Sequence, residues 1–191
     1  MKAPFLIGRK IYLRPLEPED VPSLKTWVND AEISRYLLLY RPMTNADEQA
    51  FLDRTRGSAT EVVLGIALRA TDRLIGTTGL HAIHPKDRHA IFGILIGDKR
   101  CWNRGYGSEA TALMVRYAFE TLNLHRVALQ VLEHNLRGVR AYEKAGFQRE
   151  GVSREDTFRD GRYWNTVHMG VLRDDWLKSR PPGEGKPTKR R

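Results

Sequence analysis

Cysteine is nearly absent from this chain of 191 residues, and long apolar runs are missing altogether. The single cysteine, Cys101, excludes an intrachain disulfide and a zinc site built from several thiolates. No stretch approaches the roughly 20 apolar residues that a membrane-spanning helix needs. The apolar stretch near the N-terminus is too short for a secretory signal peptide. The sequence therefore predicts a soluble cytoplasmic protein without membrane contact.

The chain does contain enough apolar material to bury a core. Hydrophobic residues make up 41% and charged residues 29% of the composition, which excludes a fully disordered chain. The length fits one domain of ordinary size. We therefore predict a single domain over residues 1–178, followed by a disordered basic tail over residues 179–191.

The positive charge is concentrated in that tail. Residues 178–191 hold six Lys or Arg and one Glu, which is more than half of the formal net charge of +9. A basic tail could contact a nucleic acid, the ribosome or an acidic partner. It could equally serve only to keep the protein soluble, and the sequence leaves both interpretations open.

The hydrophobic pattern mixes strands and helices. Alternating or β-branched runs predict strands, and apolar residues at helical spacing after acidic or Thr start signals predict helices. The expected strands are 10–15, 61–69, 73–81, 89–97, 125–132, 147–158 and 162–172. A first helix is expected to begin at Pro18, and the further expected helices are 31–40, 45–56, a segment within 98–122, and 136–145. Several hairpins with one central strand-helix-strand unit predict a single α/β or α+β domain.

The segment Trp102-Asn103-Arg104-Gly105-Tyr106-Gly107-Ser108-Glu109-Ala110 lies between an expected strand and helix. Glycines allow a ligand to approach the backbone, and the free N–H groups at a helix start favour phosphate. The spacing also imitates a dinucleotide-binding loop, which raises a nicotinamide oxidoreductase as an alternative. A dinucleotide-binding loop is followed about 20 residues later by an acidic residue that binds the ribose. This chain has Leu129 and Gln130 there, which argues against the alternative.

Two motifs together resemble the GNAT superfamily of acetyl-CoA-dependent N-acetyltransferases. They are the 102–110 loop and the run Asn135…Ala141-Tyr142-Glu143-Lys144-x-Gly146-Phe147. The segments 9–16 and 93–99 are similar to the RimJ/RimL branch, which acetylates ribosomal-protein N-termini, and to polyamine acetyltransferases. The resemblance covers about residues 8–178. It implies a GNAT-like fold, with a mixed, mostly antiparallel sheet and a central β-α-β unit that binds the coenzyme.

The resemblance also assigns roles. It implies a transferase in which acetyl-CoA gives its acetyl group directly to an amine. It places Asn135 and Tyr142 in the catalytic site, with Tyr142 as the acid that protonates the departing thiolate. A backbone N–H near Leu95 to Gly97 would hold the developing oxyanion. The residues expected to contact the coenzyme are Leu95, Ile96, Gly97, Trp102, Asn103, Arg104, Gly105, Tyr106, Gly107, Ser108, Asn135 and Tyr142.

The chain also departs from the family pattern. Relatives often carry a Glu, a candidate general base, where this chain has Ile91, and a Ser or Thr where it has Gly138. By residue type the substitute base could be Glu133, His134, His81, His84 or Asp98. The loop-like spacing of the histidines at 81, 84 and 89 predicts no metal site.

The sequence leaves open which class of amine accepts the acetyl group. The resemblance favours a peptide or protein α-amine, and the mildly basic body fits a polycationic amine, such as a polyamine or an aminoglycoside, less well. The Glu missing at Ile91 and the basic tail leave a catalytically degenerate, coenzyme-binding regulatory module as another alternative. The sequence is compatible with a monomer or a homodimer.

Overall fold

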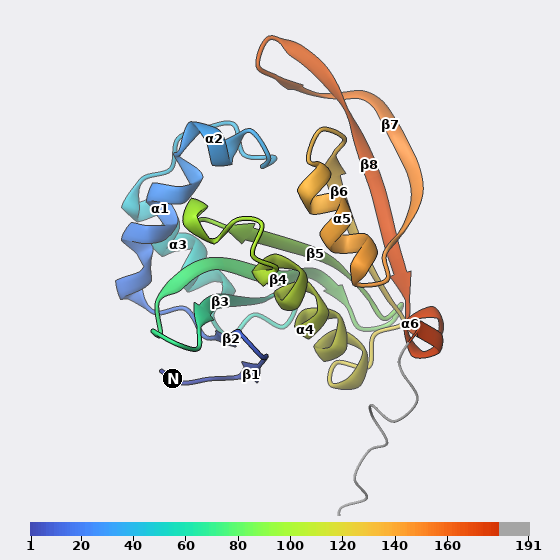
Figure 1. Ribbon diagram of the computed structural model, residues 1–191, viewed down its shortest axis with the longest axis horizontal. Coiled ribbons are helices and arrows are strands. Elements are labelled where there is room, and N and C mark those ends of the chain that lie inside the picture. Colours follow the sequence, from blue (N-terminus) through green and yellow to red (C-terminus); the bar gives the residue numbers. More distant parts are fainter. Residues whose placement is uncertain (180–191) are drawn as a thin grey trace, which may run out of the picture.

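An eight-stranded sheet organises the computed structural model, which describes residues 1–179 (Figure 1). In chain order the elements are β1 (Leu6–Ile7), β2 (Ile11–Arg14), the 3-10 turn η1 (Pro18–Asp20), α1 (Val21–Val28), α2 (Ala31–Ser34), α3 (Asn45–Thr55), β3 (Val62–Leu68), β4 (Leu74–His84), β5 (His89–Ile96), the 3-10 turn η2 (Lys99–Cys101), α4 (Tyr106–Glu120), β6 (Arg126–Leu132), α5 (Leu136–Lys144), β7 (Gln148–Arg159), β8 (Arg162–Leu172) and α6 (Arg173–Ser179).

The strands follow the order β1-β2-β3-β4-β5-β6-β8-β7. Neighbouring strands pair antiparallel except β5 and β6, which run parallel and are joined through α4. A parallel pair needs such a crossover, because the chain must return to the same end of the sheet. The predicted α+β domain with a central β-α-β unit is therefore confirmed.

Helices cover both faces of the sheet, because successive strand residues point to opposite sides. On β3, Leu64 belongs to the large core cluster that includes Met114 and Phe119 of α4. The adjacent residue Val63 instead packs against a smaller cluster built from α1 and α3, with Leu24 as a member. The two helical layers are thus fixed by the alternation of apolar residues along one strand.

The parallel pair separates soon after it forms. Pairing between β5 and β6 covers only residues 89–91 and 126–128, although β5 continues to Ile96 and β6 to Leu132. In Figure 1, β6 rises away from the plane of β4 and β5. Two diverging strands leave backbone groups without a sheet partner, so this opening is the natural place for a ligand.

The hairpin of β7 and β8 arches back over the molecule toward α2 (Figure 1). Its tip, Asp160-Gly161, has positive φ angles of 51° and 77°, which is the backbone that a two-residue hairpin turn requires. Arg35, just after α2, forms an ion pair of 2.7 Å with Asp160. This contact joins segments 125 residues apart in the chain.

Some local expectations need correction. The predicted helix over 31–40 is wrong beyond α2, because the Leu37 and Leu39 carbonyls accept hydrogen bonds from Arg159 rather than from a helix. The short elements β1 and α6 were not predicted from the sequence. The expected tail lies outside the described residues except for Ser179. Within residues 1–179, no helix is long and apolar enough to cross a bilayer.

Candidate active site

A cavity of about 710 Å³ occupies the opening between β5 and β6. We call one side the coenzyme half, because it holds the residues that the sequence predicts to contact the coenzyme; it consists of the loop 102–108, the end of β5 and the helix α5. We call the other side the acceptor half, as the part of the wall that those predictions leave for an acceptor; it consists of the segment 36–39 with His81 and Ile91. Every residue expected to contact the coenzyme lines the cavity except Gly97 and Arg104.

The glycine loop presents the start of α4 to the cavity. Gly105 is the N-cap residue of α4 and has φ of +84°, a conformation that glycine adopts without strain. No side chain caps this helix start. Glu109, the acidic residue of the first turn, instead accepts a hydrogen bond of 2.9 Å from the Lys10 N–H. The first amides of α4 are therefore free to bind an anion.

Trp102 anchors this loop to the strand before it. Its indole N–H donates a hydrogen bond of 2.7 Å to the carbonyl of Ile96. The Arg137 guanidinium lies 3.9 Å from the centre of the Trp102 ring and 5.2 Å from that of Tyr36. Arg137 thus links the loop, α5 and the acceptor half through cation–π contacts.

The backbone of β5 offers donors to the opening, though not all those expected. The Gly97 N–H donates to the Ile75 carbonyl at 2.9 Å, so the expectation that it is a free oxyanion donor is wrong. In an antiparallel pair every second residue directs its N–H at the same neighbouring strand, so the N–H of Leu95, two residues before Gly97, also faces β4. The N–H groups of Ile94 and Ile96 consequently face the opening between β5 and β6.

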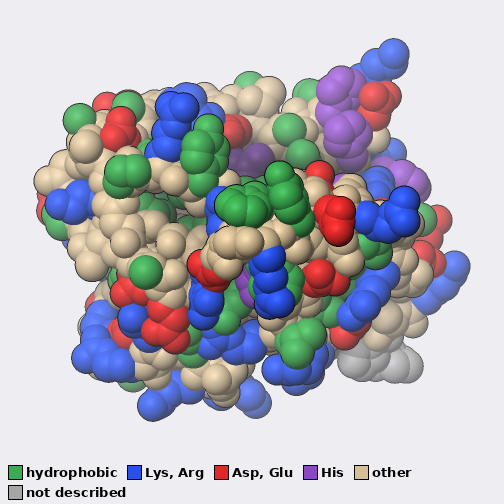
Figure 2. Space-filling model, turned by 90° about the horizontal axis from the view of Figure 1, so that it is seen from above, with side chains coloured by type: hydrophobic (Ala, Val, Ile, Leu, Met, Phe, Trp, Pro, Cys, Tyr) green, Lys and Arg blue, Asp and Glu red, His purple; other side chains and the backbone are tan. Residues whose placement is uncertain are grey.

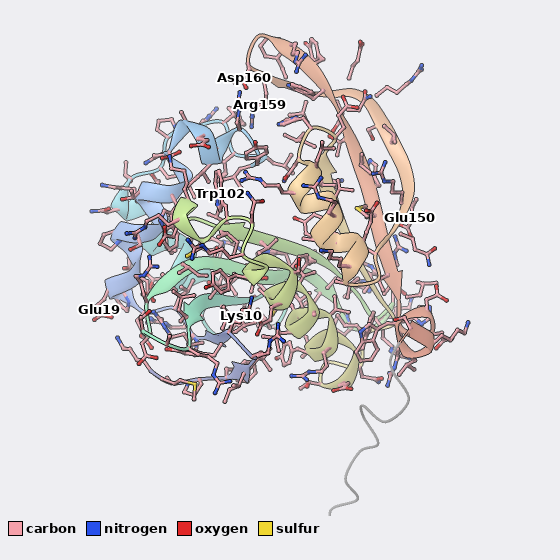
Figure 3. The ribbon with its side chains drawn as sticks, viewed as in Figure 1. Lys10, Glu19, Trp102, Glu150, Arg159 and Asp160 are labelled. Carbon is pink, nitrogen blue, oxygen red and sulfur yellow. The ribbon has the colours of Figure 1, made fainter. Side chains whose placement is uncertain are left out.

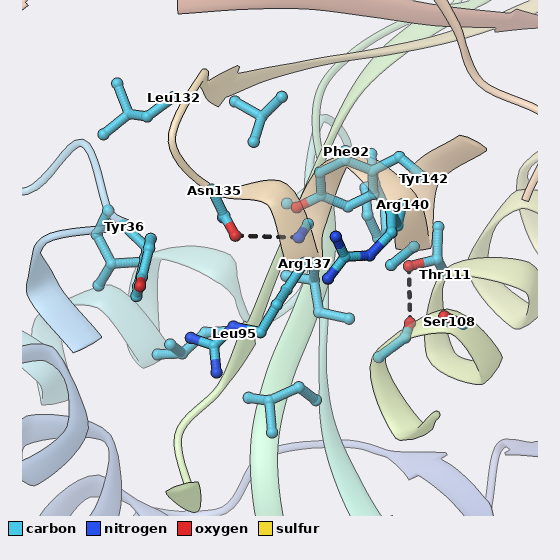
Figure 4. A pocket seen from close by; sticks show the side chains of 18 of the residues that line it. Tyr36, Phe92, Leu95, Ser108, Thr111, Leu132, Asn135, Arg137, Arg140 and Tyr142 are labelled. Atoms are coloured by element: carbon cyan, nitrogen blue, oxygen red, sulfur yellow. Dashed lines mark hydrogen bonds between the residues drawn. The ribbon is translucent and has the colours of Figure 1, made fainter. Parts of the chain in front are cut away.

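Asn135 begins the helix α5. Its side-chain oxygen accepts a hydrogen bond of 3.0 Å from the Gly138 N–H, as Figure 4 shows. A Cβ at Gly138 would come 2.8 Å from the Asn135 amide nitrogen. Glycine at this position therefore lets Asn135 cap the helix while its amide N–H groups stay available to the cavity.

Tyr142 lies two turns further along α5, on its buried face. Its ring meets Phe92 of β5 edge-on at 6.1 Å and Phe147 at 6.1 Å. Burial raises the pKa of the Tyr142 hydroxyl to about 12, because the phenolate would lose its hydration. Tyr142 is therefore a neutral hydrogen-bond donor throughout the physiological pH range.

The acceptor half is held by the hairpin tip, which sequence reasoning did not connect with the site. Arg159 donates hydrogen bonds of 3.2 and 2.7 Å to the carbonyls of Leu37 and Leu39. Figure 3 shows Arg159 and Asp160 at the end of the hairpin, above the α2 segment. The turn signal Asp160-Gly161 identified the hairpin, but nothing in the sequence indicated what its tip contacts.

Of the five candidate bases, only His81 lines the cavity. Glu133 is bonded to Asn165, and Asp98 is paired with Arg73 and Arg100. His84 lies near the exposed turn between β4 and β5.

The fifth candidate, His134, is locked beside the hairpin. Its ring packs 4.1 Å from that of Trp164, and its Nε2 is 3.3 Å from the Arg35 carbonyl. Its Nδ1 is buried without a hydrogen-bond partner. Burial lowers the pKa of His134, so the ring stays neutral at pH 7, yet His134 is not among the residues that line the cavity.

The histidines considered for a metal separate in space. The ligand atoms of His84, His89 and Asp87 lie within 4.8 Å of one another at the β4–β5 turn, whereas His81 contacts Glu61. The His84 and His89 rings stack almost parallel, and the Asp87 N–H donates to Nδ1 of His84. Stacked imidazoles do not direct their in-plane lone pairs at one ion, so this cluster has the wrong orientation for a metal.

Comparisons with known proteins agree with this geometry. Residues 10–148 match the family model described as an acetyltransferase (GNAT) domain. The Bacillus subtilis (strain 168) protein named "Uncharacterized N-acetyltransferase YoaA" is 30% identical over 174 residues, or 89% of this chain and 97% of that protein. The spermidine N(1)-acetyltransferase of Escherichia coli (strain K12) is 27% identical over 184 residues, or 95% and 97% of the two chains.

A solved structure also superposes closely. It is the spermidine N-acetyltransferase from Vibrio cholerae in complex with CoA and spermine, with a TM-score of 0.82 and 26% identity. The match covers 89% of this chain and 99% of that one. The family match makes acetyl-CoA the cofactor, and the nicotinamide oxidoreductase alternative is therefore wrong.

Proposed function

Because the chain belongs to the GNAT family of acetyl-CoA-dependent N-acetyltransferases, we propose that its acceptor is the N-terminal α-amine of a peptide or protein. Acetyl-CoA supplies an activated thioester, whose acetyl group passes directly to the amine. The observation that carries the choice of acceptor is the lack of acidic side chains in the cavity wall. None of the described residues that line the cavity, in the acceptor half or elsewhere, is Asp or Glu.

A polyamine carries several ammonium groups, and each would need a carboxylate or a comparable acceptor near it. Two acids beside the acceptor half are already engaged in this structure: Asp160 pairs with Arg35, and Glu133 accepts hydrogen bonds from Asn165. Figure 2 shows acidic and basic side chains interspersed over the face seen from above. A peptide N-terminus brings only one positive charge to this wall.

The apolar surface of the acceptor half suits the first side chain of a peptide. Tyr36, Leu37, Leu38 and Leu39 line the cavity, and Leu38 is 56% exposed although it is strongly hydrophobic. Covering such a side chain with a substrate residue would be favourable by about 1 kcal/mol or more. A polyamine offers less apolar side-chain surface at that position.

For the coenzyme, the free amides at the start of α4 would hold the diphosphate, with Arg140 and Lys144 supplying positive charge. The amide N–H groups of Asn135 would bind the pantetheine arm. The N–H of Ile96 faces the opening and would stabilise the negative charge that develops on the acetyl oxygen. This assignment replaces Gly97 with Ile96 as the donor.

Tyr142 would act on the departing sulfur as a neutral donor. A pKa of about 12 lies well above that of a thiol, which is about 8.5, so complete proton transfer to a free thiolate is uphill. Donation of a hydrogen bond to the sulfur as the carbon–sulfur bond lengthens remains favourable. Tyr142 would therefore stabilise the leaving group and release its proton only as negative charge accumulates there.

The test compares acceptors under one set of conditions. The protein is mixed with acetyl-CoA and one acceptor, and release of the coenzyme thiol is followed. The acceptor is either a short peptide with Ser or Ala at its N-terminus or spermidine. We expect a higher kcat/KM for the peptide, with mass spectrometry locating the acetyl group on the α-amine. The same peptide with a blocked N-terminus should give no release above the background hydrolysis.

The polyamine alternative has its own support, because two of the similar proteins described above are named as spermidine acetyltransferases. A higher kcat/KM for spermidine than for every peptide would favour that alternative and overturn the peptide proposal. The acetyl transfer itself would stand in either case.

A further inference from the structure

We propose that His81 is the general base of this enzyme and that Glu61 positions it. Ile91 of β5 lines the cavity, but it is apolar and offers no base there. His81 lies on β4 directly opposite Ile91 in the sheet register. Directly opposite residues of an antiparallel pair project on the same face. The imidazole thus stands beside Ile91 at the wall of the cavity.

Two facing glycines make room for this ring. Gly79 and Gly93 are also opposite each other in the register of β4 and β5. A Cβ at Gly79 would come 2.9 Å from Nε2 of His81, and one at Gly93 would come 3.5 Å from it. Any larger residue at Gly79 would displace the imidazole, so the glycine pair lets His81 lie across β4 and β5 at the cavity wall.

Glu61 fixes the orientation of the ring. Its Oε1 lies 3.2 Å from Nδ1 of His81, and its other oxygen is paired with Arg54 of α3. The Glu61 side chain is 14% exposed, whereas that of His81 is 33% exposed. A carboxylate on Nδ1 favours the tautomer that carries its proton there. Nε2 is then the unprotonated nitrogen, and it is the one that lies over the glycine pair.

The base and the proposed leaving-group donor approach from opposite faces of the sheet. His81 shares its face with Ile91 and Gly93, while Phe92 points to the other face and packs against Tyr142. Both His81 and Tyr142 line the same cavity. An amine can therefore be deprotonated on one side while the sulfur departs on the other.

The proton balance closes with these two groups. Nε2 of His81 takes one proton from the acceptor ammonium and passes it to solvent. The neutral nitrogen then bonds to the acetyl carbon, and the carbon–sulfur bond breaks. As the sulfur takes the Tyr142 proton, the nitrogen gives its second proton to the same oxygen, so the Tyr142 hydroxyl is restored without forming a free phenolate. The products are the N-acetylated amine, the free coenzyme thiol and one proton.

The test replaces His81 with Gln, which keeps a polar side chain next to Glu61. With a peptide α-amine we expect His81→Gln to lower the single-turnover transfer rate by about 10²-fold. The affinity for acetyl-CoA, measured by calorimetry, should change less than twofold. The matched control is His84→Gln, a histidine of the same strand outside the cavity, which should leave the rate unchanged.

The decisive comparison changes the acceptor. An acyl hydrazide without an α-amine, whose terminal nitrogen is already neutral at the assay pH, needs no deprotonation before attack. The loss caused by His81→Gln should then shrink to a few-fold. An equal loss with both acceptors would overturn the assignment, because it would indicate a structural role. An unchanged rate with the α-amine would overturn it as well.

Glu61 is tested through its dependence on His81. Glu61→Gln alone should lower the rate about tenfold, and it should add almost nothing in the His81→Gln background. Independent, additive losses would contradict the positioning role. The proposal does not depend on which amine accepts the acetyl group: if spermidine proves the better acceptor, the same variants are compared on spermidine.

Discussion

The two halves of the cavity are built in different ways. The coenzyme half is built mainly from backbone: the helix start at Gly105, the N–H of Ile96 and the cap at Asn135. The acceptor half is built from side chains that reach across the fold, such as Arg159 bonded to Leu37 and Leu39 more than 100 residues away. One half is encoded locally, and the other depends on distant contacts.

Amino-acid substitutions should affect the two halves differently. Backbone amides carry no residue identity, so the coenzyme half keeps its chemistry as long as the turn and the helix start keep their shape. The acceptor half changes whenever a residue of the hairpin tip or of the 36–39 segment changes. Substitutions should therefore separate coenzyme binding from acceptor binding.

The largest effect is expected at Tyr142 of α5, in the coenzyme half. Tyr142→Phe keeps the packing against Phe92 but removes the hydrogen-bond donor, so the transfer rate should fall by about 10²-fold. Acetyl-CoA affinity should stay within a few-fold of the unmodified protein. Single-turnover measurements are needed, since an unchanged rate of the chemical step would refute the role of this hydroxyl.

A matched pair of glycine substitutions sharpens the comparison further. Gly105 and Gly161 both have positive φ, at 84° and 77°, and a valine at either position is strained by about 1–3 kcal/mol. Gly105→Val should weaken acetyl-CoA binding about tenfold, because the helix start moves. Gly161→Val should leave that affinity unchanged and raise the acceptor KM. Calorimetry and steady-state kinetics on both variants would show whether the effects separate or coincide.

A smaller effect is expected where the hairpin tip supports the acceptor wall. Arg159→Ala removes both hydrogen bonds to the 37–39 carbonyls, so the acceptor KM should rise about threefold to tenfold while kcat changes little. Arg154→Ala is the matched control, because Arg154 is an exposed arginine of the same strand and its substitution should not change KM. Equal changes in the two variants would show that the tip contacts do not shape the wall.

The smallest effect concerns stability at acidic pH. Burial lowers the pKa of His134, so the folded state binds this proton less readily than the unfolded chain. The stabilising contribution is complete above the unfolded pKa of about 6.5 and is lost as the pH falls through the folded pKa. The urea midpoint should therefore drop between pH 7.5 and 5.5, and it should drop less in His134→Gln. A drop of the same size in both proteins would exclude His134 as its source.

Most of the architecture could be predicted because its signals are local. Thr44 starts α3 with a capping box, Gly105 starts α4, and Gly146 has the positive φ that follows the end of α5. Each of these depends on residues within one helical turn. The segment 36–40 was misassigned for the opposite reason: its apolar residues suggested a helix, but contacts with the hairpin decide its conformation.

The site divides along the same line. The glycine loop, Asn135 and Tyr142 carry the motifs from which the sequence predicts the coenzyme half, and all of them lie within the segment that matches the family model. No sequence motif indicates which backbone N–H groups face the opening. The hydrogen bond from the Gly97 N–H to the Ile75 carbonyl determines this, because alternation along the strand then directs the N–H of Ile96 toward β6.

The sequence by itself determined the family and the α+β order of most elements, and it predicted a coenzyme loop, because helix starts, turns and strand alternation are properties of neighbouring residues. The sequence offered no reason to prefer any one of the five candidate general bases. Only the tertiary structure set His81 opposite Ile91, over two glycines and against Glu61. It also brought the hairpin tip to the acceptor wall. The physical reason is that strand register and long-range packing join residues whose separation in the chain carries no local signal.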